Sequence, residues 1–220
     1  EQGSAPSQYN LGKAYAELVF PKDYKKALKW YRKSAEQGFY KAQNTLGLMY
    51  VRGLGVERDY HEAIKWFRQG AEQGDAVSQN NLGSMYQNGR GVEQNYREAA
   101  KWYMKSAEQG YALAQNSLGV LYHSGIGVEQ DYKEAVKWYK KAAEQGDANA
   151  KTNLKLVESR IRNEDEISNL AIIYKYDAEQ GDAHAQRSLA FMYYKGEGVD
   201  RDFVKAAEWF RKAAEQGDAD

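Results

Sequence analysis

Three patterns in the sequence contain residue types that can do chemistry, but none has the neighbours that the chemistry needs. His61-Glu62 begins as a zinc-protease helix does, but Lys65 stands where the second histidine is required, and His123 and His184 lie far along the chain. Gly-x-Gly-Val recurs without the following Gly-Lys-Ser/Thr or the preceding strand of a phosphate-binding loop. The many carboxylates recur as helix caps and surface residues, so no unique acid/base pair emerges. We therefore expect no enzyme, no metal site and no cofactor.

Composition sets further bounds. The chain has 220 residues, with 31 basic and 31 acidic side chains, and this balance argues against a general attraction to nucleic acid or anionic membrane. No apolar run approaches the roughly 20 residues that span a bilayer. The absence of cysteine excludes disulfides and thiol chemistry and fits the cytoplasm and the periplasm alike. The sequence begins inside a repeated pattern, so the lack of a visible leader leaves the compartment open.

The elements that must position any site are repeats. The tripeptide Glu-Gln-Gly starts at positions 1, 36, 72, 108, 144, 179 and 215, an interval of 35 or 36 residues. This period with two helical patterns per repeat predicts an all-α fold, an α-solenoid of about six antiparallel helix pairs. We treat residues 1–220 as a single repeat array, with repeats one to six at 4–38, 39–74, 75–110, 111–146, 147–181 and 182–217.

Repeat three shows the pattern most clearly. Asp75 precedes the first helical run and Asn95 the second, and each is placed to cap its helix, with Asn95 and Glu98 spaced as a capping box. The small residues Gly83 and Ala99 should let the two helices approach closely, with large neighbours interlocking around the contact. The neighbours expected there are Leu82, Tyr86 and Trp102.

Repeat five (147–181) departs from the pattern. Lys155 replaces the close-packing glycine, Ile173 replaces the tryptophan, and a charged run, 160–166, replaces the glycine turn. The later apolar residues still follow helical spacing. We interpret this repeat as a helical pair with altered packing, through a longer first helix or a kink in the stack. A flexible charged linker is the alternative.

The pattern A-x-x-Q-x-x-L-G-x-x-Y, then G-x-G-V, then D-Y-x-x-A-x-x-W-Y-x-x-A-A-E-Q-G-D resembles the Sel-1-like repeat (SLR), a relative of the tetratricopeptide repeat. The match is specific in repeats two, three, four and six, partial in repeat one and poor in repeat five. The resemblance implies a right-handed superhelix with a concave face. It also implies a protein-binding adaptor of a kind common in bacteria, although kinship of fold does not fix function.

By the same analogy, the first helix of each pair lines the concave face. The positions beside the packing residues would then face the groove and form a candidate binding surface for another protein or an extended peptide. These positions are Lys41, Asn44, Leu48, Val51, Arg52, Val77, Asn80, Ser84, Gln87, Asn88, Leu113, Asn116, Val120, His123, Ser124, His184, Arg187, Phe191, Tyr194 and Lys195.

Two features of this surface suggest a ligand. Asn44, Asn80 and Asn116 hold one position in consecutive repeats, and a ladder of amides can pair with the backbone of an extended peptide. The alternative is that these amides stabilise the packing between helices. The basic residues among the candidates, at positions 41, 52, 187 and 195, favour an acidic segment or a peptide C-terminus, with scattered solvated charge as the alternative.

The sequence therefore favours a non-enzymatic adaptor that binds a protein or peptide through the solenoid. The alternative is a bacterial inhibitor or immunity-type protein that clamps a specific enzyme or toxin. An enzyme or small-molecule receptor would need a catalytic constellation, and the sequence shows none.

Overall fold

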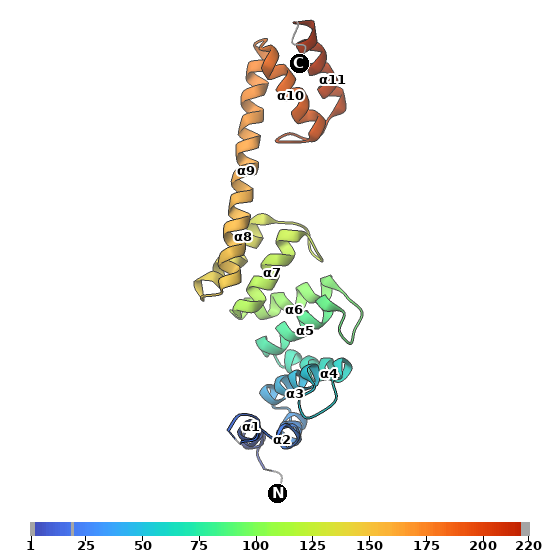
Figure 1. Cartoon of the computed structure of the whole chain (residues 1–220), viewed down its shortest axis with the longest axis vertical. Coiled ribbons are helices and arrows are strands. Elements are labelled where there is room, and N and C mark those ends of the chain that lie inside the picture. Colours follow the sequence, from blue (N-terminus) through green and yellow to red (C-terminus); the bar gives the residue numbers. More distant parts are fainter. Residues whose placement is uncertain (1–2, 19, 217–220) are drawn as a thin grey trace. The chain divides into compact units, whose positions relative to one another are not determined.

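The computed structural model describes residues 3–18 and 20–216, and every regular element in them is helical (Figure 1). The described residues form two compact bodies, one ending at Leu154 and the other beginning at Lys155. The helices are α1 (Ala5–Lys13, followed by a π-helical turn, Ala14–Leu18), α2 (Tyr24–Glu36), α3 (Tyr40–Arg52), α4 (Tyr60–Glu72), α5 (Ala76–Asn88), α6 (Tyr96–Glu108), α7 (Ala112–Ser124), α8 (Tyr132–Glu144), α9 (Ala148–Glu179), α10 (Ala183–Lys195) and α11 (Phe203–Glu215).

Consecutive helices pack as pairs, α1 with α2, α3 with α4, α5 with α6, α7 with α8, and α10 with α11. In the N-terminal body α2, α4 and α6 also pack against the first helix of the next repeat, which is α3, α5 and α7 respectively. The predicted caps are present, because the Asp75 carboxylate accepts from the backbone N–H of Ser78 at 2.8 Å and the Asn95 side chain accepts from that of Glu98 at 3.0 Å. The predicted α-solenoid is confirmed.

Within each of the first four pairs, a glycine of the first helix lies against an aromatic ring of the second. A Cβ atom added to Gly83 would lie 2.9 Å from two ring atoms of Tyr103, and one added to Gly119 would lie 2.7 Å from the ring of Tyr139. The ring at the Gly83 crossing is therefore Tyr103, whereas the sequence predicts Trp102 for this role. Trp102 is only half-buried, while Tyr103 is buried.

The turn between the helices of a pair joins neighbouring repeats. Gly127, the second glycine of its turn, has a left-handed backbone with φ of 75°, and a Cβ atom there would lie 2.5 Å from the carbonyl oxygen of Tyr96 in the preceding repeat. Gly91 approaches Tyr60 in the same way. The recurrent Gly-x-Gly-Val is thus a packing device, since only glycine combines this conformation with this approach.

The recurrent Glu-Gln-Gly also has a structural role. In repeat three the Gln109 amide donates to the side-chain oxygen of buried Gln79 at 2.7 Å, and the Gln79 amide donates to the backbone oxygen of Ala71 in the preceding repeat at 3.1 Å. Equivalent bonds occur in repeats two, four and six. These glutamines connect the two helices of one repeat to the repeat before it.

Repeat five is one helix, α9, where the sequence predicts a helical pair or a flexible linker. The charged run at 160–166 contains neither glycine nor proline, so nothing in it ends the helix. The residues that would meet inside a closed pair are also unsuitable. Lys155 stands at the position of Gly83, and Asp177 stands at the position of Ser106, which is fully buried. A closed pair would bury both charges, which is costly without partners.

Candidate protein-binding surfaces

The first-helix surface predicted from the sequence is held together by side-chain amides. The Asn81 amide donates to the side-chain oxygen of Asn44 at 2.7 Å, and the Asn153 amide donates to that of Asn116 at 3.0 Å. These bonds join the first helices of consecutive repeats. At the corresponding position beside Asn80 the next repeat has Ser117. Two of the three ladder amides are therefore engaged in packing between repeats, and each keeps its N–H groups for another partner.

Other predicted residues also have local partners. The side-chain oxygen of Gln87 accepts from the Tyr103 hydroxyl at 2.7 Å, and the Asn88 amide donates to the backbone oxygen of Ser84 at 2.7 Å. The ring of His123 lies 5.6 Å, centroid to centroid, from that of Tyr132. The exposed candidates are Lys41, Arg52, Asn88, Leu113, Ser124, His184, Phe191, Tyr194 and Lys195, and the rest are half-buried.

In the C-terminal body the candidate residues of α10 make an aromatic surface. Phe191 is 48% exposed, and its ring meets that of Phe210 edge to face at 4.9 Å. Tyr194 is 55% exposed, and its ring lies 5.7 Å from that of Phe203. Rings held in this way present apolar area to a partner at low conformational cost. The face of repeat six therefore differs in chemistry from the polar faces of repeats two to four.

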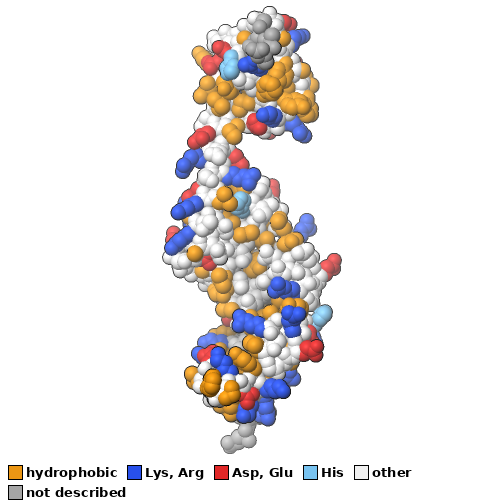
Figure 2. Space-filling view, in the orientation of Figure 1, with side chains coloured by type: hydrophobic (Ala, Val, Ile, Leu, Met, Phe, Trp, Pro, Cys, Tyr) orange, Lys and Arg blue, Asp and Glu red, His pale blue; other side chains and the backbone are white. Residues whose placement is uncertain are grey.

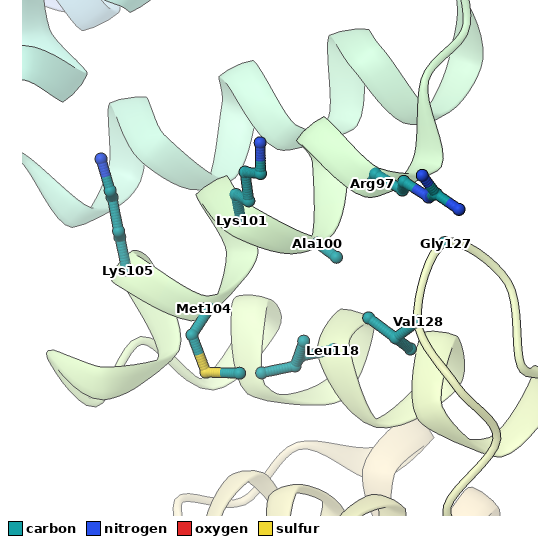
Figure 3. A pocket seen from close by; sticks show the side chains of 8 residues that line it. All are labelled: Arg97, Ala100, Lys101, Met104, Lys105, Leu118, Gly127 and Val128. Atoms are coloured by element: carbon teal, nitrogen blue, oxygen red, sulfur yellow. The ribbon is translucent and has the colours of Figure 1, made fainter.

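A second kind of surface lies over the second helices, and the sequence analysis did not identify it. A pocket of about 530 Å³ lies between α6, Leu118 of α7 and the turn at Gly127. Figure 3 shows Met104, Leu118 and Val128 pointing into this space, with cationic side chains of α6 around it. The cations that line it are Arg97, Lys101 and Lys105. An apolar floor with a basic rim suits an apolar group flanked by carboxylates.

Related pockets lie over α4 and α2. The pocket over α4 has a volume of about 460 Å³ and includes Lys65 and Arg68, and the pocket over α2 has a volume of about 380 Å³ and includes Lys29. The sequence feature that could have indicated these pockets is the recurrence of lysine or arginine at outward positions of the second helices. One of these cations also contacts a tryptophan, since the Lys105 ammonium lies 4.3 Å from the ring centroid of Trp102.

Several titratable groups of the described residues have shifted pKa values. Burial raises the pKa of Tyr103 to about 12, and burial likewise raises the pKa of Tyr139 to about 12. A hydrogen bond with Glu62 raises the pKa of Lys65. Within residues 3–18 and 20–216, no group of three or more His, Asp or Glu side chains is placed to hold a metal ion. No helix in the described part of the chain is both long and apolar enough to cross a membrane.

Stacked helix pairs with variable exposed side chains define an α-solenoid of the kind that binds other proteins. The Sel1 repeat model matches residues 5–39, 41–75, 76–111, 112–147 and 183–218, which is most of the chain. The chain belongs to the Sel1 repeat family, and repeat five is the one that the family model passes over. A search of curated proteins found no match.

Several solved structures are similar. A Sel1 repeat protein from Oxalobacter formigenes is 35% identical, with a TM-score of 0.67, and the match covers 97% of this chain and 88% of that one. The protein c5321, a protective antigen of uropathogenic Escherichia coli with an SLR fold, is 37% identical, with a TM-score of 0.66; the match covers 97% of this chain and spans 46% of that protein. The immunity protein Pa5087 of Pseudomonas aeruginosa shares the fold at 19% identity, with a TM-score of 0.51, over 96% of this chain and 81% of that one.

Proposed function

We propose that this protein is a non-enzymatic adaptor that binds another protein or an extended peptide across its first helices. The observation that carries the proposal is the side-by-side arrangement of α3 with α5 and of α7 with α9, fixed by the pairs Asn44–Asn81 and Asn116–Asn153. Around these fixed amides the accessible residues change from repeat to repeat. A constant frame with variable neighbours is what sequence-selective recognition of an extended segment needs.

Charge on this surface favours an acidic ligand. Lys41 and Arg52 are exposed on α3, and the exposed part of α10 carries Lys195, which forms an ion pair with Glu197 at 3.8 Å. The ammonium of Lys41 lies near the ring of Tyr40, 5.9 Å from its centroid. A segment with carboxylates, or a free C-terminus, would gain charge-assisted hydrogen bonds with such groups.

The test compares partners captured from the source organism by the wild-type chain and by a Lys41→Glu/Arg52→Glu variant, quantified by mass spectrometry. A matched control, Lys133→Glu/Lys140→Glu, makes the same charge change at exposed positions of a second helix, α8, outside the pockets described above. We expect the first variant to lose the specific partner, and the control to keep it. Equal capture by all three proteins would contradict the proposal.

The same experiment separates an adaptor from a clamp of the inhibitor or immunity type. If the captured partner is an enzyme or toxin, its activity is measured with and without an equimolar amount of the chain. Stoichiometric inhibition that the Lys41→Glu/Arg52→Glu variant abolishes would favour the clamp. Binding that leaves the partner's activity unchanged would favour the adaptor.

A further inference from the structure

The second half of α9 exposes a face that, in the other second helices, is covered by the first helix of the same repeat. In α6 this face contains Ala99, Tyr103 and Ser106, which are 0%, 3% and 0% exposed because α5 packs on them. Counted from the shared Glu-Gln-Gly, the corresponding residues of α9 are Leu170, Tyr174 and Asp177.

Leu170 is 42% exposed, and the adjacent Ile173, at the position of Trp102, is 55% exposed. Tyr174 and Asp177, by contrast, are half-buried. Figure 2 shows hydrophobic side chains gathered on the surface of the C-terminal body. The first half of α9 cannot cover this face by folding back, because it continues the same helix. The position that a first helix occupies in the other repeats is therefore vacant in repeat five.

We propose that this vacant position binds an amphipathic helix of a partner protein, lying antiparallel to the second half of α9. In other repeats this face binds a first helix that has a glycine at the crossing. Thus α5 packs on α6, and α7 packs on α8. A partner helix with a small residue at the crossing would bury Leu170 and Ile173, and burial of large aliphatic side chains drives association.

Asp177 gives the orientation. In α6 the equivalent Ser106 donates a hydrogen bond to the backbone oxygen of Ala76, the first residue of α5, at 2.6 Å. Asp177 therefore marks the place where an incoming helix would begin. The first backbone N–H groups of a helix lack partners and carry partial positive charge, so a carboxylate stabilises them. A closed helix pair within this chain would bury the Asp177 carboxylate without a partner. At the start of a partner's helix, the same carboxylate can accept hydrogen bonds from the first backbone N–H groups.

A second copy of this chain is a poorer occupant. Within the described residues, α1, α3, α5, α7 and α10 each already pack on their own second helix. The first half of α9 is not paired in this way, but it carries Lys155 at the crossing, where the other first helices have glycine or alanine. A helix from a different protein is thus the occupant that the face favours. This inference concerns a different surface from the proposed function and does not depend on it.

The test uses a stapled, N-acetylated peptide with the sequence of residues 111–125, which contains α7, as a model first helix. Its binding to the full chain is followed by fluorescence anisotropy. We expect saturable binding that Leu170→Asp/Ile173→Asp weakens by at least about tenfold. The control is Ile172→Asp, at a residue that is 67% exposed and lies on another side of the same helix, and it should leave binding unchanged. Circular dichroism checks that each variant is folded.

Orientation provides a readout that nonspecific adhesion would not produce. The chain has no cysteine, so Glu179→Cys creates a single attachment point beyond Asp177. The introduced thiol is first activated as its mixed disulfide with 2-nitro-5-thiobenzoate. A peptide with an N-terminal cysteine should then displace the thionitrobenzoate by thiol–disulfide exchange faster than a peptide with a C-terminal cysteine. Equal rates, equal loss of binding in the control variant, or no saturable binding up to about 1 mM would overturn the proposal. Self-association that Leu170→Asp/Ile173→Asp abolishes would overturn it in favour of a second copy.

Discussion

Replacing Gly83 with leucine should destabilise the protein by overpacking the crossing of α5 and α6. A Cβ atom at this position would lie 2.9 Å from the nearest ring atoms of Tyr103 and 3.3 Å from the backbone oxygen of Ala99. Tyr103 is 3% exposed and its hydroxyl is held by Gln87, so the ring has little room to move. The leucine side chain would have to displace this ring or separate the two helices.

The magnitude follows from two opposed effects. Overpacking of a well-packed core costs about 1–3 kcal/mol. Removing a glycine from the middle of a helix returns roughly 0.8–1 kcal/mol of helix propensity. Because leucine extends well beyond the Cβ atom that already overlaps the ring, we expect the cost to dominate, leaving a net loss of about 1–2 kcal/mol. For a chain of this size that corresponds to a fall in Tm of roughly 2–8 °C.

Chemical denaturation followed by circular dichroism measures this loss. Val77→Leu is the matched control, because it adds bulk to a half-buried position of the same helix, and it should change the free energy of unfolding little. The cost of Gly83→Leu should largely vanish in a Tyr103→Ala background, where the ring is absent. An unfolding free energy unchanged by Gly83→Leu, or the same loss with and without the Tyr103 ring, would refute the packing argument.

Three further predictions concern the same repeats. Trp102→Ala should cost about 2–3 kcal/mol by chemical denaturation, below the roughly 3–5 expected for a fully buried tryptophan, because Trp102 is half-buried; a larger loss would contradict this. Gln79→Ala should cost about 1–3 kcal/mol in the same assay, because it removes two hydrogen bonds of a buried side chain, one to the Ala71 carbonyl oxygen and one from the Gln109 amide, at about 0.5–1.5 kcal/mol each, whereas loss of a solvated hydrogen bond would cost far less. Stability should fall as the pH rises from 10 to about 12: burial raises the pKa of Tyr103 and Tyr139 above the ordinary 10.0, so the unfolded chain loses these protons first. Thermal melts across this range check the sign, and a Tyr103→Phe/Tyr139→Phe variant should show a smaller fall.

Outside repeat five, the repeat period was enough to predict the helix pairs and the caps at Asp75 and Asn95, because each copy repeats the same local signals. It was not enough to assign the contacts between helices. The sequence shows adjacent aromatic residues at 102 and 103 in repeat three, and helical periodicity alone does not decide which of them faces Gly83. The glutamine network escaped prediction for a similar reason. Gln79 and Gln109 lie thirty residues apart, and only the closing of the pair brings their amides together.

The candidate site shows the same limit. The sequence identified the aligned asparagines, and it left open whether they bind a ligand or stabilise packing. Asn44 and Asn116 do bond to neighbouring helices, through partners one position further along the next repeat, at Asn81 and Asn153. The pockets over the second helices escaped notice because a lysine or arginine on an exposed helix face is usually only solvated. Over α6 and α4 the turn of the following repeat completes the pocket, at Gly127 and at Gly91.

Repeat five has lost one interface of a second helix while keeping the other. The side of α9 that meets α10 follows the family pattern: Ala171 and Ala178 are 2% exposed, and the Gln186 amide donates to the backbone oxygen of Ala178 at 3.1 Å. On the side that a first helix would cover, Leu170 and Asp177 replace the small residues of the pattern. The second half of α9 therefore keeps its contact with α10 while presenting a face that its own chain does not fill.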